Sequence, residues 1–222
     1  MMTDACIPAP KLYLLTNDDA FDTLYQKLTA AFATDVVGLL QIRRKHVLSQ
    51  PDGQAQLYKE AQQLIALAQR YDVPVVINDD TALAATLGVG VHLGQQDGSV
   101  YDAKQQLAAG QIIGRTCHGD ASLVTEAQQA GADYAAMGAI FASTTKPKAA
   151  TISKEALAAG CATGMPICVI GGLTPTNIVT LAGLPLRYVA VVGDIMDLPV
   201  AQIAARCHEW QQALAQLGTR QA

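Results

Sequence analysis

Two acidic residues follow short apolar segments of this sequence in a pattern that could hold a metal ion. Residues 73–80 read VPVVINDD, so an apolar run ends in an amide and two adjacent acids. Residues 90–97 read GVHLGQQD, so a second apolar run leads to Asp97. Adjacent side chains point apart, so we expect Asp79 to converge on one point with Asp97 and Asp80 to cap the following helix. Two carboxylates suit Mg²⁺, which takes few protein ligands together with phosphate oxygens.

Basic residues follow other apolar segments. Arg43 and Lys45 belong to QIRRK at 41–45, and Lys146 ends STTK at 143–146. Cations beside a carboxylate-held metal fit a substrate that carries a diphosphate. Glycines 171, 172 and 193 can present backbone N–H groups to a second phosphate. The plainer alternatives are a solvated charge cluster for QIRRK, a turn for STTK and tight packing for the glycines.

These side chains need parallel strands to bring them to one edge. Apolar segments at residues 11–16, 37–43, 73–78, 90–94, 112–117, 134–140, 166–172 and 188–193 alternate with stretches of helical periodicity. Asp120, and Thr174 before Pro175, have the residue types of helix starts. Eight such units favour a single-domain (β/α)₈ TIM barrel across residues 1–222, with an irregular segment at 1–10, over a doubly wound open sheet. Chemistry in such barrels lies at the carboxyl ends of the strands.

Composition narrows the class of partner. Half of the 222 residues are apolar, 15% are charged and the net charge is −4. We therefore expect no basic surface for nucleic acid or an anionic membrane, and no apolar run reaches the length of a membrane span. Five scattered cysteines and the lack of an evident signal peptide favour the reducing cytoplasm. Small phosphorylated molecules are the expected partners, and a homo-oligomer is left open.

The ordered motifs resemble one known family. KLYLLTND, LLQIRRK, VPVVINDD, GVHLGQQD, AGADY, GAIFASTTKP and VIGGLTPTNI, spread over residues 11–195, resemble thiamine phosphate synthases. The resemblance implies a (β/α)₈ barrel that uses Mg²⁺ as a cofactor. It also implies a transferase that joins hydroxymethylpyrimidine diphosphate to a thiazole phosphate and releases diphosphate.

The same resemblance implies roles for individual residues. Asp79 and Asp97 match the metal ligands, and Arg43, Lys45 and Lys146 match the catalytic cations that neutralise the departing diphosphate. The residues implied to contact the pyrimidine diphosphate are Gln41, Arg43, Lys45, Asn78, Thr116 and Lys146. Those implied to hold the thiazole phosphate are Ser143, Thr144, Thr145, Gly172, Val192 and Gly193.

Three departures from the family pattern concern charge and loop shape. Arg44 replaces a common glutamate, and residues 142–143 replace a common Pro-Thr pair. Asp194 stands where small residues are usual, and a phosphate would repel it unless its side chain turns to solvent or caps the last helix.

Two alternative functions stay open at this stage. One is a thiazole tautomerase with His118 as an acid/base group, and the other is a non-catalytic paralogue that binds a phosphate ligand. The acids and cations at positions 43, 45, 79, 97 and 146 argue against the tautomerase, because it would have little use for them.

Overall fold

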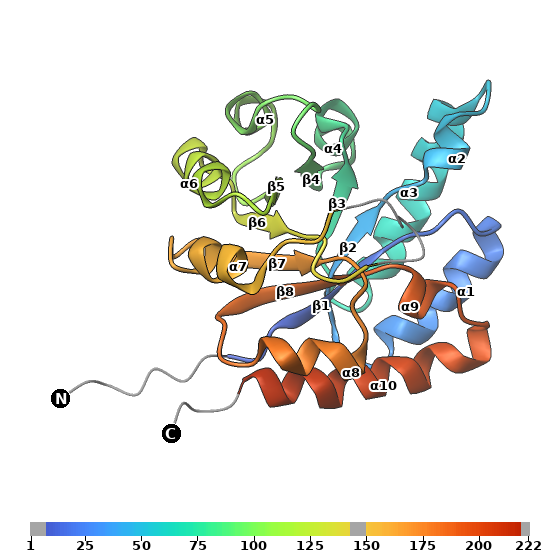
Figure 1. Cartoon of the computed structure of the whole chain (residues 1–222). Coiled ribbons are helices and arrows are strands. Elements are labelled where there is room, and N and C mark those ends of the chain that lie inside the picture. Colours follow the sequence, from blue (N-terminus) through green and yellow to red (C-terminus); the bar gives the residue numbers. More distant parts are fainter. Residues whose placement is uncertain (1–7, 143–149, 219–222) are drawn as a thin grey trace.

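The chain forms a closed barrel of eight parallel strands (Figure 1). The computed structural model describes residues 8–142 and 150–218. The strands are β1 (Lys11–Leu15), β2 (Val37–Ile42), β3 (Val75–Asn78), β4 (Gly90–Leu93), β5 (Ile113–His118), β6 (Tyr134–Met137), β7 (Ile167–Ile170) and β8 (Leu186–Val191). Each of the eight predicted strand segments overlaps one of them, and the TIM-barrel prediction is confirmed.

Helices surround the barrel (Figure 1). They are α1 (Phe21–Phe32), α2 (Lys45–Leu48), α3 (Gly53–Gln69), α4 (Thr81–Leu87), α5 (Val100–Gln106), α6 (Ala121–Ala130), α7 (Lys154–Cys161), α8 (Pro175–Ile178), the 3₁₀ helix η1 (Val179–Leu181), α9 (Gly193–Met196) and α10 (Val200–Leu217). Within residues 8–142 and 150–218, none of them combines the length and the apolar composition that a membrane crossing requires.

Strand side chains alternate between two packed layers. In β1, Leu12 and Leu14 pack between the strands and the helices, whereas Tyr13 lies in the barrel interior. The rings of Tyr13, Tyr134 and Tyr188 fill that interior, with centroids 5.6 to 5.9 Å apart. The barrel is therefore a solid core, and ligands must bind at one of its ends.

The predicted helix starts are confirmed. The side chain of Asp80 accepts a hydrogen bond from the Leu83 N–H at 2.8 Å and caps α4. Asp120 caps α6 in the same way, and Thr174 forms a capping box before Pro175. Each cap stabilises its helix by about 1 kcal/mol and sets where the loop from the preceding strand ends.

Some predictions fall on positions outside the described residues. These are Ser143, Thr144, Thr145 and Lys146, together with residues 1–7 of the expected irregular N-terminal segment. Their roles stay predictions.

Candidate active site at the carboxyl ends of the strands

Asp79 and Asp97 converge at the carboxyl ends of β3 and β4. Asp79 has a left-handed φ of 65°, and its N–H donates to the His92 carbonyl of β4 at 2.8 Å. A methyl group built on Gly94 would contact the Oδ2 atom of Asp97 and lie 3.9 Å from the Oδ1 atom of Asp79. Both carboxylates therefore reach the small space beside Gly94, as the sequence predicted.

The two acids repel each other in the absence of a cation. Burial and the negative charge of Asp79 raise the pKa of the Asp97 carboxyl above its ordinary value, while Lys45 opposes that rise. Sites that hold carboxylates in such unfavourable proximity commonly serve binding or catalysis.

Two more predicted residues contact this acid pair. The Nζ atom of Lys45, in the first turn of α2, lies 3.8 Å from Asp79 Oδ2. The side-chain amide of Asn78 donates to the same oxygen at 2.5 Å. The backbone N–H of Arg43 donates to the Thr16 hydroxyl at 2.8 Å, which ties the end of β2 to the end of β1.

Arg115 holds the loop that carries Asp97, and sequence reasoning missed it. Its Nη1 atom donates to the carbonyls of Gly94 at 2.8 Å and Gly98 at 2.7 Å. Its Nη2 atom donates to the Gln95 carbonyl at 3.3 Å. Three contacts from one guanidinium fix a loop without regular structure. An arginine inside the apolar IIGRTC run was the available signal.

A chain of hydrogen bonds crosses the barrel interior from Gln41 to Thr116. The Gln41 amide donates to the Tyr13 hydroxyl at 2.7 Å, and Tyr13 bonds the Tyr134 hydroxyl at 2.8 Å. His92 connects Tyr134, at 2.8 Å from Nδ1, to the Thr116 hydroxyl, at 2.9 Å from Nε2. The Gln41 nitrogen can only donate, so the buried Tyr13 hydroxyl accepts there, and Tyr134 is the other partner available to take the Tyr13 proton among the described residues.

The proton order makes His92 an Nε2–H tautomer. The order that gives each buried tyrosine proton an acceptor has Tyr13 donate to Tyr134, Tyr134 to Nδ1 of His92, and Nε2 of His92 to Thr116. Burial lowers the pKa of His92 to about 4 and raises the pKa values of both tyrosines, so every member stays neutral. Within the described residues the hydroxyl proton of Thr116 has no acceptor and is available to a ligand.

His92, Tyr13 and Tyr134 were not among the predicted site residues. The signal for them was a polar group in the middle of an apolar strand segment, as in GVHLG at 90–94. His118, the predicted acid/base group of the tautomerase alternative, is exposed at the end of β5 with a φ of 50°.

The end of β7 has a left-handed backbone at two glycines, beside the end of β8. Gly171 and Gly172 have φ values of 104° and 61°, which favour glycine. A methyl group on Gly172 would lie 2.6 Å from the Phe141 carbonyl oxygen. The Asn177 side chain donates to the Gly172 carbonyl at 2.8 Å. The neighbouring strand, β8, ends just before Val192, and Gly193 is the first residue of α9.

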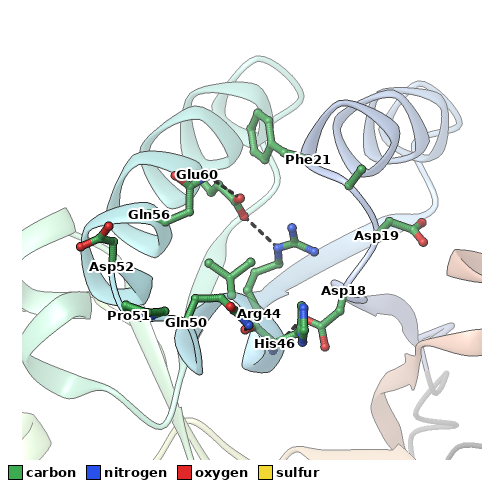
Figure 2. Close-up of a pocket in the computed structure, with 12 residues that line it drawn as sticks. Asp18, Asp19, Phe21, Arg44, His46, Gln50, Pro51, Asp52, Gln56 and Glu60 are labelled. Atoms are coloured by element: carbon green, nitrogen blue, oxygen red, sulfur yellow. Dashed lines mark hydrogen bonds and ion pairs between the residues drawn. The ribbon is translucent and has the colours of Figure 1, made fainter.

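Arg44 points away from the acid pair, into a cavity of about 530 Å³ outside the barrel (Figure 2). Its Nε atom donates to Glu60 of α3 at 2.8 Å, and its Nη1 atom donates to the Asn17 carbonyl at 2.7 Å. Both side chains of the pair are nearly inaccessible to water. Neither Asp79 nor Asp97 lines this cavity, so Arg44 adds no charge to the mouth of the barrel.

Asp194 neither faces solvent nor caps the last helix, which corrects the sequence expectation. It lies in the first turn of α9, and its carboxylate packs against the side of α10, where Arg206 and Trp210 bind it.

The donor set fits a hard divalent cation. Asp79 and Asp97 supply carboxylate oxygens, the ligands that Mg²⁺ prefers. Within residues 8–142 and 150–218, no cluster of three or more His, Cys, Asp or Glu side chains could enclose a metal. An ion here would complete its coordination with water and substrate oxygens, as Mg²⁺ does beside phosphates.

Fold and site together define a TIM-barrel protein with a charged binding site at the carboxyl ends of its strands. The family model described as thiamine monophosphate synthase matches residues 12–195. The chain belongs to this family of transferases in thiamine biosynthesis.

Relatives agree with that family, and a solved structure agrees with the fold. The chain is 38% identical to a thiamine-phosphate synthase of Marinobacter nauticus, over 93% of this chain and 91% of that protein. It is 35% identical to one of Methylobacillus flagellatus, over 92% of this chain and 95% of the other. A solved thiamine phosphate pyrophosphorylase from Pyrococcus furiosus has the same fold, with a TM-score of 0.77, 23% identity, and coverage of 93% of this chain and 96% of that one.

Proposed function

We propose that this protein joins hydroxymethylpyrimidine diphosphate to a thiazole phosphate, with Mg²⁺ as cofactor, and releases thiamine phosphate and diphosphate. The observation that carries the proposal is the convergence of Asp79 and Asp97 beside Lys45. Two acids this close are favourable only with a bound cation, and a nearby lysine is useful only if the ligand is also anionic.

The basic side chains would assist departure of the leaving group. Lys45, with Arg43 and Lys146, would neutralise negative charge that develops on the diphosphate as its bond to the pyrimidine methylene breaks. A Mg²⁺ ion held by Asp79 and Asp97 would supply further charge neutralisation to the same phosphate oxygens. The electron pair of the broken bond stays with the diphosphate, and the thiazole nitrogen supplies the pair for the new bond to the methylene, so no protein nucleophile is required.

The interior hydrogen-bond chain would orient the pyrimidine ring. Thr116 can offer its hydroxyl proton at one side of the mouth, and Gln41 lies at the other end of the same neutral chain. Because Tyr13, Tyr134 and His92 keep one proton order, Gln41 and Thr116 would present a fixed arrangement of hydrogen-bonding groups to the pyrimidine ring. Asn78, which already orients Asp79, would contact the diphosphate side.

The thiazole phosphate would be held at the ends of β7 and β8. Its attachment there, by Gly172, Val192, Gly193 and the residues 143–145, would direct the thiazole nitrogen toward the pyrimidine methylene. Backbone N–H groups at a strand end of this kind are suited to phosphate oxygens.

The test is direct. Purified protein is mixed with both substrates, with and without Mg²⁺, and thiamine phosphate and diphosphate are quantified. We expect both products in equal amounts, only with the metal, and loss of activity of at least about a hundredfold in Asp79→Ala and Asp97→Ala. Isomerised thiazole without diphosphate release would instead support the tautomerase, and binding without turnover would support the non-catalytic paralogue.

A further inference from the structure

The carboxylate of Asp194 is bound on both of its oxygens by the last helix. Arg206 Nε donates to Oδ2 at 2.9 Å, and Arg206 Nη2 donates to Oδ1 at 2.5 Å. The indole Nε1 of Trp210 donates to Oδ2 at 2.8 Å. A two-pronged arginine contact with a carboxylate is a strong, charge-assisted interaction, and only 12% of the Asp194 side chain is exposed.

The other end of α9 is held as well. The Met196 carbonyl accepts from Lys27 Nζ at 2.6 Å and from the Asn17 side chain at 2.9 Å. Lys27 is buried and also pairs with Asp19 at 2.6 Å. A helix of four residues is too short to be stable by itself, so these contacts fix its place between α1 and α10 (Figure 1).

We infer that Arg206 is a positioning residue for the thiazole phosphate, because it neutralises the Asp194 carboxylate and holds it against α10, beside the turn at Val192 and Gly193; this rests on the proposed function. That phosphate would meet backbone N–H groups at this turn. Because Asp194 follows Gly193 directly, the orientation of the Asp194 side chain and the conformation of the turn depend on each other.

Arg206 also cancels a charge that would otherwise oppose the ligand. The hydrogen bonds that Arg206 donates to Asp194, and a weaker contribution from Glu209, raise the pKa of Arg206 above its ordinary value. Arg206 therefore keeps its positive charge and offsets the negative charge of Asp194. An unpaired Asp194 would place a negative charge one residue from the phosphate-binding turn and would repel the ligand.

The experiment measures both Michaelis constants of the full-length protein in six forms. They are the wild type, Arg206→Gln, Arg206→Lys, Asp194→Asn, the double variant with Arg206→Gln and Asp194→Asn, and the control Glu209→Gln. Glu209 bonds the same arginine at 2.5 Å but is largely exposed, and its loss leaves the contact with Asp194 in place. Thermal unfolding of each form shows whether it is folded.

We expect Arg206→Gln to raise KM for the thiazole phosphate about tenfold. Its KM for the pyrimidine diphosphate and its kcat at saturation should change by less than about twofold. The double variant should recover most of the loss because it carries no unpaired charge, Arg206→Lys should recover part of it, and Glu209→Gln should match the wild type.

Equal changes in both Michaelis constants, or an unchanged KM for the thiazole phosphate, would overturn the inference while leaving the proposed function in place. So would a double variant as weak as Arg206→Gln, because the effect would then be structural and unrelated to charge. A wild type that forms no thiamine phosphate from both substrates and Mg²⁺ would instead remove the proposed function, and this inference with it.

Discussion

The Nδ1 atom of His92 lies 2.8 Å from the hydroxyl of Tyr134, and the imidazole is buried in the barrel interior. In the proton order that pairs the buried tyrosine hydroxyls, Nδ1 is an unprotonated acceptor, so a charged His92 would disrupt that order. Burial, together with the positive charge of Arg115, lowers the pKa of His92 to about 4.

The first prediction is therefore an acid-sensitive stability. An unfolded histidine has a pKa of about 6.5, so the unfolded state binds a proton first, and the free energy of unfolding should fall as pH drops from about 6.5 to 4. The full loss is on the order of 3 kcal/mol. Denaturant unfolding at several pH values gives the free energy of unfolding, which should vary less steeply with pH in His92→Gln than in the wild type. The matched control is His208→Gln, because His208 is exposed. Identical slopes in His92→Gln and the wild type would refute this assignment.

The second prediction concerns the acid pair. The raised pKa of Asp97 means that its ionisation in the metal-free protein costs stability as pH rises above the ordinary value of an aspartate. Asp97→Asn should thus unfold at a higher temperature than the wild type at pH 7 in EDTA, by about 1 to 3 °C. Added Mg²⁺ should stabilise only the wild type. A variant that gains no stability in EDTA, or responds to Mg²⁺ as the wild type does, contradicts the paired arrangement.

The third prediction concerns Gly172. Alanine there must adopt a φ of 61° and also place its methyl group 2.6 Å from the Phe141 carbonyl oxygen. We expect a loss of about 2 to 4 kcal/mol of stability and a higher KM for the thiazole phosphate. The control is Gly183→Ala, which has a φ of 88° but no atom within 4 Å of the added methyl group. Similar losses in both variants would mean that the close carbonyl contact has no effect.

The fourth prediction concerns the buried pair of Arg44 and Glu60, whose atoms Nε and Oε2 are 2.8 Å apart. Glu60→Gln leaves the arginine charge buried without its partner and should cost about 3 kcal/mol in denaturant unfolding. Arg44→Met combined with Glu60→Leu removes both charges and should be much less destabilising. If the double variant loses as much stability as Arg44→Met and Glu60→Leu lose together when each is measured alone, the two residues do not act as a pair.

Several site features were predictable because they depend on short-range pattern. The apolar run that ends in Asn78, Asp79 and Asp80 predicts both a strand end and a cap, and the structure confirms each. The convergence of Asp79 with Asp97 followed from one further rule, that parallel strands end at a common edge.

The partners of Asp194 and Arg44 could not be predicted in the same way. Asp194 meets Arg206 twelve positions later only because α9 and α10 pack at one particular angle, and Glu60 meets Arg44 across a full loop and helix. Likewise, the chain from Gln41 to Thr116 depends on the register of five strands.

By itself, the sequence determined the barrel, the order of its strands and which end carries the polar groups, because hydrophobic periodicity and capping act between near neighbours in the chain. Only the tertiary structure decided which charges neutralise one another and which protons face the ligand. Those pairings join residues far apart in sequence, and packing, which sets the distance and orientation between elements, has no local signature.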